Sequence, residues 1–418
     1  MEYQIADVFS PRSFPQNTYV TRKVKGNETI DGRMKKALTM KGNLIFVSGA
    51  SKSGKTVLCH SVIDEDKYIG LSGSQITCRD DFWNHIAEQI PVFDTVTTTS
   101  INQINTSENK NSSIGVNVGV FSAKFGGNEG ENSLSGSNVA TTVARTERQI
   151  IQYLIANNKV LVIDDFHYIS ADAQMYIART LKTELFNGLK AVIISLPHRS
   201  DEAIICNPDL IGRTTSITIP PWTENELREI AVKGFHLLNI AIDDKAVDLL
   251  ARESITSPQL MQDNCFNLAF LVQNTSQTIT TDLVCEAFRE TVQNYSHYDR
   301  LVEAISEGPL RGIGHRKQYK LRHGTADIYQ LLVCALKADP PVTTISMGEL
   351  KERIRNLLYN RETLSGIVIS SPLRKVIHIV KTIMPDLDAL EYKNQRLYIL
   401  DPFLLFYLRW QITSQEVS

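Results

Sequence analysis

Residues 49–56 read GASKSGKT, a complete match to the G-x-x-x-x-G-K-[ST] pattern of phosphate-binding loops. The apolar, β-rich run 44–48 precedes the match, and residues 57–63 can continue as a helix. A strand, a glycine turn and a helix start form the context that this motif needs, because backbone N–H groups and the helix N-terminus then point at one place. The sequence therefore predicts a nucleoside triphosphate site on these residues.

The motif assigns a role to most of its residues. The Lys55 side chain would reach the β- and γ-phosphates, and the Thr56 hydroxyl would bind Mg²⁺. The glycines allow the backbone to curl around the β-phosphate. Backbone groups around the phosphates would come from the loop and the helix start, namely Gly49, Ser51, Lys52, Ser53, Gly54, Lys55, Thr56 and Val57.

A second motif is the segment 159–168, KVLVIDDFHY. Its run 160–163 is continuously apolar and β-branched, as in a central parallel strand that is buried on both faces. The strand would end in Asp164 and Asp165, at the edge where open α/β sheets bind ligands. This is the Walker B arrangement, in which Asp164 would hold Mg²⁺ and Asp165 would orient the attacking water. A simple Asp-Asp turn is the alternative, and the loop at 49–56 favours the site.

Alternating strand and helix patterns predict the fold class. Buried strands at 44–48, 160–163, 191–195 and 216–220, with a helix at 171–186, indicate an α/β fold with a doubly wound parallel sheet. A capping box, Thr223-x-x-Glu226, then opens helical patterns through residue 235 and at 245–252, 258–273 and 280–294. We expect an N-terminal linker (1–42), a phosphate-loop core (43–220), a helical lid (221–307) and a winged-helix domain (308–418).

A polar insertion at about 94–145 interrupts the core. It is rich in Ser, Thr, Asn and Gly, which is unusual for so long a segment inside a compact domain. One alternating patch predicts a β-hairpin around 114–126. The insertion would be either a contact element for a partner or another subunit, or a flexible spacer.

The C-terminal region predicts three helices, at 325–338, 346–359 and 370–384, then a hairpin around 393–396 and a last helix at 401–411. This order is that of a winged helix. The third helix would carry a basic stripe, Arg374, Lys375, His378 and Lys381. Residues 308–418 contain 16 Lys and Arg against 10 Asp and Glu, whereas residues 1–307 contain 28 against 36. DNA contact through the stripe is one interpretation; protein docking with a solvated stripe is the other.

Composition excludes several classes of protein. Of the 418 residues 42 % are hydrophobic and 22 % charged, as in an ordinary soluble chain. No apolar run approaches the ~20 residues that span a membrane, and the N-terminus lacks a signal pattern. Six scattered cysteines form no C-x-x-C pair, so neither a disulfide framework nor a zinc site is indicated. We expect a cytoplasmic protein without membrane contact.

Taken together, these motifs resemble the AAA+ and STAND-like P-loop ATPases. The closest shape is that of archaeal-type ATPases and origin-recognition initiators, which join an ATPase core, a lid and a winged helix. The resemblance covers roughly residues 19–410 and is strongest at 49–56 and 163–165. It implies ATP and Mg²⁺ as ligands, and self-association into an oligomer.

The resemblance also implies roles for residues outside the two motifs. Ser195 would watch the γ-phosphate as sensor 1, with His198 as a less favoured candidate. Arg213 would be an arginine finger that reaches a neighbouring subunit, the alternative being an ordinary surface arginine. Pro258 would pack against the nucleotide, and Tyr19 and Val20 would pack on adenine.

Two departures from the family pattern bear on function. Asp165 replaces the glutamate of most AAA+ motors, and its shorter side chain indicates slow hydrolysis. Gln259, not an arginine, follows Pro258 at the sensor-2 position of the lid.

The favoured function is therefore an ATP-driven switch that associates through Arg213 and relays its nucleotide state to a protein effector, for example in prokaryotic defence. The alternative is a DNA-binding regulator of replication or transposition. A metabolic kinase is disfavoured because no substrate domain is evident.

Overall fold

The computed structural model of the chain describes residues 3–91, 95–99, 138–142, 147–196, 212–275, 277–309, 316–321, 324–359, 368–385 and 387–411. The hairpin predicted around 114–126 and the candidate His198 lie outside the described residues.

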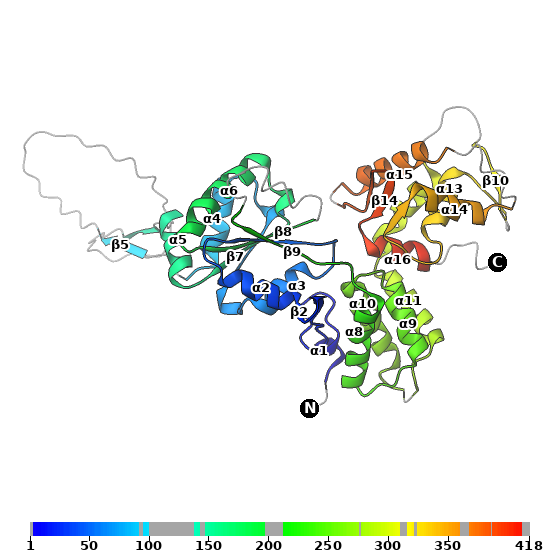
Figure 1. Cartoon of the computed structure of the whole chain (residues 1–418), viewed down its shortest axis with the longest axis horizontal. Helices are drawn as coiled ribbons and strands as arrows, with labels where there is room; N and C mark the ends of the chain where they lie inside the picture. Colours follow the sequence, from blue (N-terminus) through cyan, green and yellow to red (C-terminus); the bar gives the residue numbers. More distant parts are fainter. Residues whose placement is uncertain are drawn as a thin grey trace, which may run out of the picture.

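A five-stranded parallel sheet forms the centre of the core (Figure 1). Its order is β4-β7-β8-β3-β9, and the strands are β3 (Leu44–Ser48), β4 (Tyr68–Ser72), β7 (Val160–Asp164), β8 (Lys190–Ser195) and β9 (Thr214–Thr218). The predicted α/β fold with a parallel sheet is confirmed. Strand β9 begins two residues before the predicted 216–220, because Thr214 and Thr215 pair with Leu44 and Ile45 of β3.

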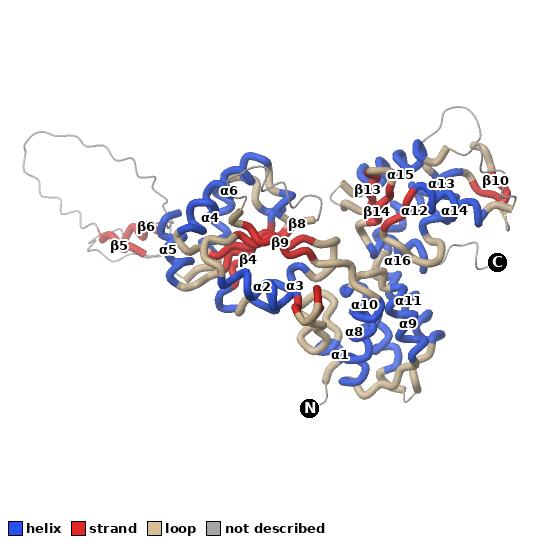
Figure 2. Tube along the Cα trace, viewed as in Figure 1, coloured by secondary structure: helices blue, strands red, loops and turns tan. Residues whose placement is uncertain are grey.

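Helices cover both faces of this sheet (Figure 2). One face carries α2 (Ile30–Thr39) and α3 (Lys55–Val62), and the other carries α4 (Arg79–Glu88), α5 (Glu147–Ala156) and α6 (Ala171–Phe186). Successive residues of a strand point to opposite faces. Accordingly Ile45 and Val47 pack with α2 and α3, whereas Leu44 and Phe46 pack in the opposite cluster. The continuous apolar runs seen in the sequence result from this two-sided burial.

The register of the sheet brings three chemically important strand ends to one edge. Ser48 of β3 is paired with Ser195 of β8, and Ile163 of β7 is paired with Ile193 of β8. The loop 49–56 follows β3 directly, and Asp164 ends β7. The carboxyl edge of the sheet therefore carries both phosphate-site motifs.

Four helices form the lid beside this edge: α8 (Glu224–Leu237), α9 (Asp244–Glu253), α10 (Pro258–Val272) and α11 (Thr281–Gln293). The predicted capping box is confirmed, since Thr223 Oγ1 accepts from Glu226 N (3.3 Å) and Glu226 Oε2 accepts from Thr223 N (2.8 Å). Such a box satisfies backbone donors that the first helical turn leaves free.

The N-terminal segment packs on the lid. It contains α1 (Ile5–Val8), followed by the short strands β1 (Lys23–Lys25) and β2 (Glu28–Thr29). The ring of Phe9 lies 5.1 Å from that of Phe235 on α8. Gly234 leaves the room for it, because a Cβ at this position would lie 2.2 Å from the Phe9 ring. The predicted linker is thus anchored in the core of the lid at its start.

The C-terminal region contains the predicted helices and hairpin. Its elements are α12 (Asp299–Glu307), β10 (Tyr319–Lys320), β11 (Thr325–Ala326), α13 (Ile328–Leu336), β12 (Thr344–Ser346), α14 (Met347–Leu357), α15 (Ser370–Ile383), β13 (Leu390–Lys393), β14 (Arg396–Ile399) and α16 (Pro402–Trp410). Strand β12 adds to the hairpin, so that an antiparallel sheet of order β12-β14-β13 stands beside the helices.

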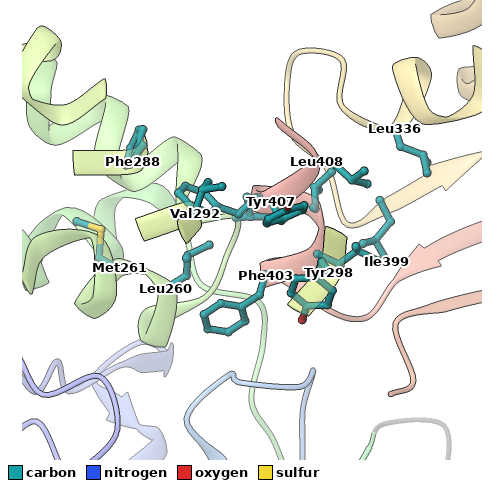
Figure 3. Close-up of a cluster of buried hydrophobic side chains, with 14 of the residues drawn as sticks. Leu260, Met261, Phe288, Val292, Tyr298, Leu336, Ile399, Phe403, Tyr407 and Leu408 are labelled. Carbon is teal, nitrogen blue, oxygen red and sulfur yellow. The ribbon is translucent and has the colours of Figure 1, made fainter. Parts of the chain in front are cut away.

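Helix α16 joins the lid to the C-terminal region in one continuous hydrophobic core. The Phe288 ring of α11 lies 5.4 Å from Phe406 and 4.6 Å from Trp410, both on α16. Figure 3 shows α16 residues between lid and C-terminal side chains: Phe403, Tyr407 and Leu408 stand between Leu260, Met261, Phe288 and Val292 on one side and Leu336 and Ile399 on the other. Lid and C-terminal region are therefore one packed unit.

An antiparallel ribbon of β5 (Thr95–Thr99) and β6 (Asn138–Thr142) projects from the core, away from the lid (Figure 1). In the part of the chain that is described, none of the helices has the length and apolar character needed to cross a bilayer.

Candidate nucleotide-binding site

A pocket of about 580 Å³ lies where the core, the N-terminal segment and the lid meet. Most of the residues predicted for the site line it: Tyr19, Val20, Ser51, Lys52, Ser53, Gly54, Lys55, Thr56, Val57, Asp164, Asp165 and Pro258. The structure thus brings together residues from four separate parts of the sequence.

The phosphate loop connects β3 to α3 with a backbone that needs glycine at two positions. Gly54 caps α3 with φ +92°, in the region that side chains disfavour. A Cβ at Gly49 would lie 2.7 Å from Ser53 Oγ and 3.1 Å from the Cβ of Ile219. The N–H groups in the first turn of α3 have no acceptor within the helix, so they are available to an anion.

The Lys55 amine is folded into the loop. Its Nζ donates to the carbonyl oxygens of Gly49 (3.1 Å) and Ala50 (2.8 Å). Burial lowers the pKa of Lys55, while the nearby carboxylates of Asp164 and Asp165 raise it. A phosphate oxygen would offer this amine a stronger, charged acceptor than the two carbonyls do.

Ser53 gives an independent test of whether the pocket fits a phosphate. Its hydroxyl oxygen is buried and has no hydrogen-bond partner among the described residues. A buried hydroxyl without a partner is costly, unless a ligand supplies one. Because Ser53 lines the pocket inside the loop, a bound phosphate group would satisfy it.

Thr56 and Asp164 meet across the pocket. Thr56 Oγ1 donates to Asp164 Oδ2 at 2.5 Å, and Asp164 Oδ1 accepts from the N–H of Asp165 at 2.8 Å. Burial raises the pKa of Asp164, partly offset by the bond from Thr56. A hydroxyl and a carboxylate are the hard oxygen donors that Mg²⁺ takes from protein beside nucleotide phosphates. This pair therefore fits a magnesium site.

Asp165 lies next to this pair with an unusual backbone. Its φ of +52° is left-handed, which is uncommon for a residue with a side chain. The turn passes so close to Gly73 that a Cβ there would lie 2.2 Å from the Asp165 carbonyl oxygen. Such strained positions cluster at functional sites, and here the strain directs the chain so that Asp165 lines the pocket.

The predicted sensor and finger residues lie outside the pocket lining. Ser195 is buried at the carboxyl edge of β8, where its hydroxyl contacts the Leu196 carbonyl at 3.5 Å. Arg213 is exposed and precedes β9 at the amino edge of the sheet, opposite the phosphate loop. Its guanidinium carbon lies 5.9 Å from the centroid of the Phe186 ring. Arg213 therefore does not line the pocket of its own chain.

The N-terminal segment forms another part of the pocket wall. The Tyr19 hydroxyl donates to Asp31 Oδ1 (2.6 Å) and lies 3.0 Å from Ser61 Oγ. Burial, with the bond to Asp31, raises the pKa of Tyr19, so the hydroxyl stays protonated. Tyr19 stacks on Phe14 with centroids 5.7 Å apart, and Val20 is buried in the lid core. Aromatic and apolar side chains of this kind suit a nucleotide base.

Several pocket residues have no motif in the sequence. Arg22 forms an ion pair with Glu226 (Nε–Oε1 2.9 Å) and lies 4.5 Å from the Trp222 ring. Trp222 Nε1 in turn donates to the carbonyl oxygen of Ser53 (2.9 Å). Arg12 and Gln262 also line the pocket. The capping box identified Glu226, but nothing local indicates its partner 204 residues away.

No protein-family model and no curated protein matches the chain. Solved structures similar to it include a Walker-type ATPase of Pyrococcus abyssi (TM-score 0.49, 10 % identity, covering 93 % of this chain and 97 % of that one). Another is the Cdc6p protein of Pyrobaculum aerophilum (TM-score 0.45, 12 % identity, covering 96 % of this chain and 96 % of that one). A third is the ORC2 protein of Aeropyrum pernix (TM-score 0.46, 10 % identity, covering 93 % of this chain and 94 % of that one). At such identities, the inference of function rests on the geometry of the pocket.

Proposed function

We propose that this chain is an ATP-binding P-loop ATPase that hydrolyses slowly, self-associates and passes its nucleotide state to a protein partner. One observation carries the proposal: Lys55, Thr56 and Asp164 converge on a pocket that the lid and the N-terminal segment close. Asp164 and Asp165 are separated from the phosphate loop by more than a hundred residues in sequence. They meet the loop because β3 and β7 end at the same edge of the sheet.

The residues divide the work of phosphate transfer. The loop N–H groups, the Ser53 hydroxyl and the Lys55 amine would bind phosphate oxygens. Thr56 and Asp164 would hold Mg²⁺, which neutralises charge on the transferred phosphate when bound. Asp165 would orient the attacking water and accept its proton. Its side chain is one carbon shorter than glutamate, which supports a slow turnover.

The path from nucleotide to partner begins at Lys52. This loop residue has φ +60°, and its Nζ lies 4.9 Å from the centroid of the Phe403 ring. Phe403 stands in the first turn of α16, and Figure 3 shows its ring extending from that helix toward the core. Since α16 belongs to the shared core of lid and C-terminal region, a change at the loop reaches the whole unit.

Self-association would use the opposite edge of the sheet. The exposed Arg213 lies there, too far around the core to serve its own pocket. In a ring of copies, this edge would face the pocket of the next subunit, where an arginine stabilises the charge of phosphate transfer.

Calorimetric titration of the full chain with ATP and Mg²⁺ tests the proposal. We expect one site per chain, and at least a hundredfold loss of affinity in Lys55→Ala, since the variant removes the charge that faces the phosphates. Lys41→Ala, an exposed lysine remote from the pocket, serves as the control and should leave affinity unchanged. Equal affinity of the wild type and Lys55→Ala would overturn the proposal.

The second candidate is a DNA-binding regulator, and α15 favours it. Arg374, Lys375, His378 and Lys381 are all exposed on this helix, whereas Leu373, Val376 and Val380 are buried on its other face. A groove of about 500 Å³ separates α15 from the β13–β14 hairpin, and Arg374, Lys381 and Lys393 line it. This basic groove is the arrangement with which a winged helix would approach a duplex.

Fluorescence anisotropy with a labelled duplex distinguishes the two candidates. A DNA-binding role predicts an affinity for DNA that falls steeply as the salt concentration rises. The double variant Arg374→Ala/Lys381→Ala should lose at least tenfold in this affinity. If the chain assembles in the presence of ATP but does not bind the duplex in this way, the switch remains as the supported function.

A further inference from the structure

Arg12 is a cation in the pocket that no described residue pairs through a hydrogen bond or an ion pair. It lines the pocket together with the phosphate-loop residues Ser51, Lys52 and Ser53. Its side chain is exposed to the pocket and, among the described residues, forms no hydrogen bond or ion pair. The other arginine in the pocket lining, Arg22, is paired with Glu226. An uncommitted guanidinium beside a phosphate loop is available to an anionic ligand.

A buried glutamine holds the segment that carries Arg12. Gln262 of α10 accepts from the N–H of Ser10 at 3.1 Å, and its Nε2 donates to Thr18 Oγ1 at 2.7 Å. Thr18 Oγ1 donates in turn to the carbonyl oxygen of Val8 at 3.0 Å. Residues 10–18 are therefore a loop whose two ends are clamped to the lid by one side chain.

The lid residue Asp263 lies within reach of the charges of both Arg12 and Lys52. Asp263 follows Gln262 on α10 and accepts from the Tyr295 hydroxyl at 2.6 Å. Burial raises the pKa of Asp263, and the charges of Arg12 and Lys52 both act to lower it. Arg12 and the phosphate-loop residue Lys52 thus act on the same lid carboxylate, in agreement with their common place in the pocket lining.

The lid itself supplies no cation at this place. The α10 residues that line the pocket are Pro258, Gln259 and Gln262, and none of these three is charged. Among the lining residues, the N-terminal loop provides the cation Arg12, and the phosphate loop provides Lys52 and Lys55.

On the premise that the pocket binds ATP, we propose that Arg12 binds the phosphate chain, and that Gln262 is the positioning residue that holds Arg12 there. A guanidinium can donate two parallel hydrogen bonds to phosphate oxygens. Since the N-terminal loop is clamped to α10, a phosphate bound by Arg12 ties the lid to the core. Through Arg12, the N-terminal segment then gives the lid a cationic contact to the phosphates, which the uncharged α10 residues of the pocket lining do not provide.

The first test compares ATP affinities of full-length variants by calorimetry. We expect Arg12→Gln to weaken ATP binding about tenfold or more, as for the loss of hydrogen bonds to a charged group. Arg12→Lys, which keeps the charge, should lose less. The control Arg148→Gln, on the exposed face of α5, should stay within about twofold of the wild type.

Two outcomes separate this inference from the proposed function. If Lys55→Ala abolishes binding but Arg12→Gln binds ATP like the wild type, the Arg12 inference is wrong and the ATP site stands. If the wild type itself does not bind ATP, both fail.

A double-mutant cycle tests the role of Gln262. If Gln262 acts by holding Arg12, then Gln262→Ala should weaken binding in the wild type but add less than about twofold in the Arg12→Gln background. Full multiplication of the two losses would show that Gln262 acts independently, and would overturn the positioning role. Thr18→Val, which removes the acceptor of Gln262 Nε2, replaces Gln262→Ala if that variant fails to fold.

Discussion

The two walls of the pocket are built on different principles. The core wall consists of the phosphate loop and the Asp164–Asp165 turn, both fixed at the edge of one parallel sheet. The lid wall consists of the N-terminal segment and α10, which side-chain clamps such as Gln262–Thr18 hold together. The lid wall also shares its hydrophobic core with the C-terminal region. Under the proposed function, the core wall would supply the chemistry, and the lid wall would supply the element that responds to it.

The largest expected effect is a loss of stability in the shared core behind the lid wall, with the core wall left intact. Phe288 is fully buried between α11 and α16, so Phe288→Ala should cost about 3–5 kcal/mol through the cavity it leaves. Chemical denaturation followed by circular dichroism measures this loss. The exposed Phe270→Ala should change the free energy of unfolding by less than about 0.5 kcal/mol. Equal losses would contradict the shared core.

The next largest effect is a loss of ATP hydrolysis at the core wall without a loss of ATP binding. Asp165→Asn should lower the rate of ATP hydrolysis by about a hundredfold or more, because an amide cannot take the proton of the attacking water. ATP affinity should change by less than about threefold, since among the described residues the Asp165 side chain forms no hydrogen bond to the loop or to the Thr56–Asp164 pair. Phosphate release and calorimetry measure the two quantities. Normal turnover would remove Asp165 from its proposed role.

Mixing of variants tests whether the two edges of the sheet cooperate between copies. The Arg213→Ala variant keeps an intact nucleotide pocket but lacks the arginine. The Lys55→Ala variant keeps the arginine but lacks a working pocket. In mixed oligomers an intact pocket meets an intact arginine, so a fraction of the wild-type turnover should return. Mixtures that stay as inactive as the separate variants would argue against action between subunits.

The smallest expected effect is a pH dependence located in the core wall. Burial raises the pKa of Asp164, so this carboxylate takes up a proton at a higher pH than an ordinary aspartate. The protonated form cannot bind Mg²⁺, and the Mg²⁺-dependent part of ATP affinity should therefore decrease as the pH falls, beginning at a higher pH than for an ordinary aspartate. Titrations at several pH values should show this decrease in the wild type and a flat profile in Asp164→Asn.

The sequence predicted the core wall well because its determinants are local. The loop 49–56 and the acids at 164–165 each occupy a few consecutive residues, and the parallel fold brings their strand ends together. The basic face of α15 and the hairpin after it were predictable for the same reason, since helix and strand periods show in short windows.

The lid wall could not be predicted because its contacts join distant residues. Gln262 and Thr18 are 244 positions apart, and Arg22 and Glu226 are 204 apart. No local pattern distinguishes Gln262 from any other helical glutamine. Strand β9 illustrates a milder limit, because Thr214 and Thr215 join the sheet through backbone pairing without the apolar character that marks a buried strand.

A crystal structure of the full chain with Mg²⁺ and a non-hydrolysable ATP analogue tests the central claim most directly. The account predicts the phosphates inside the loop 49–56, within hydrogen-bond distance of Lys55 Nζ, with Mg²⁺ bound by Thr56 and Asp164. An analogue bound elsewhere, or a loop that stays closed on Lys55 at saturating analogue, would contradict it.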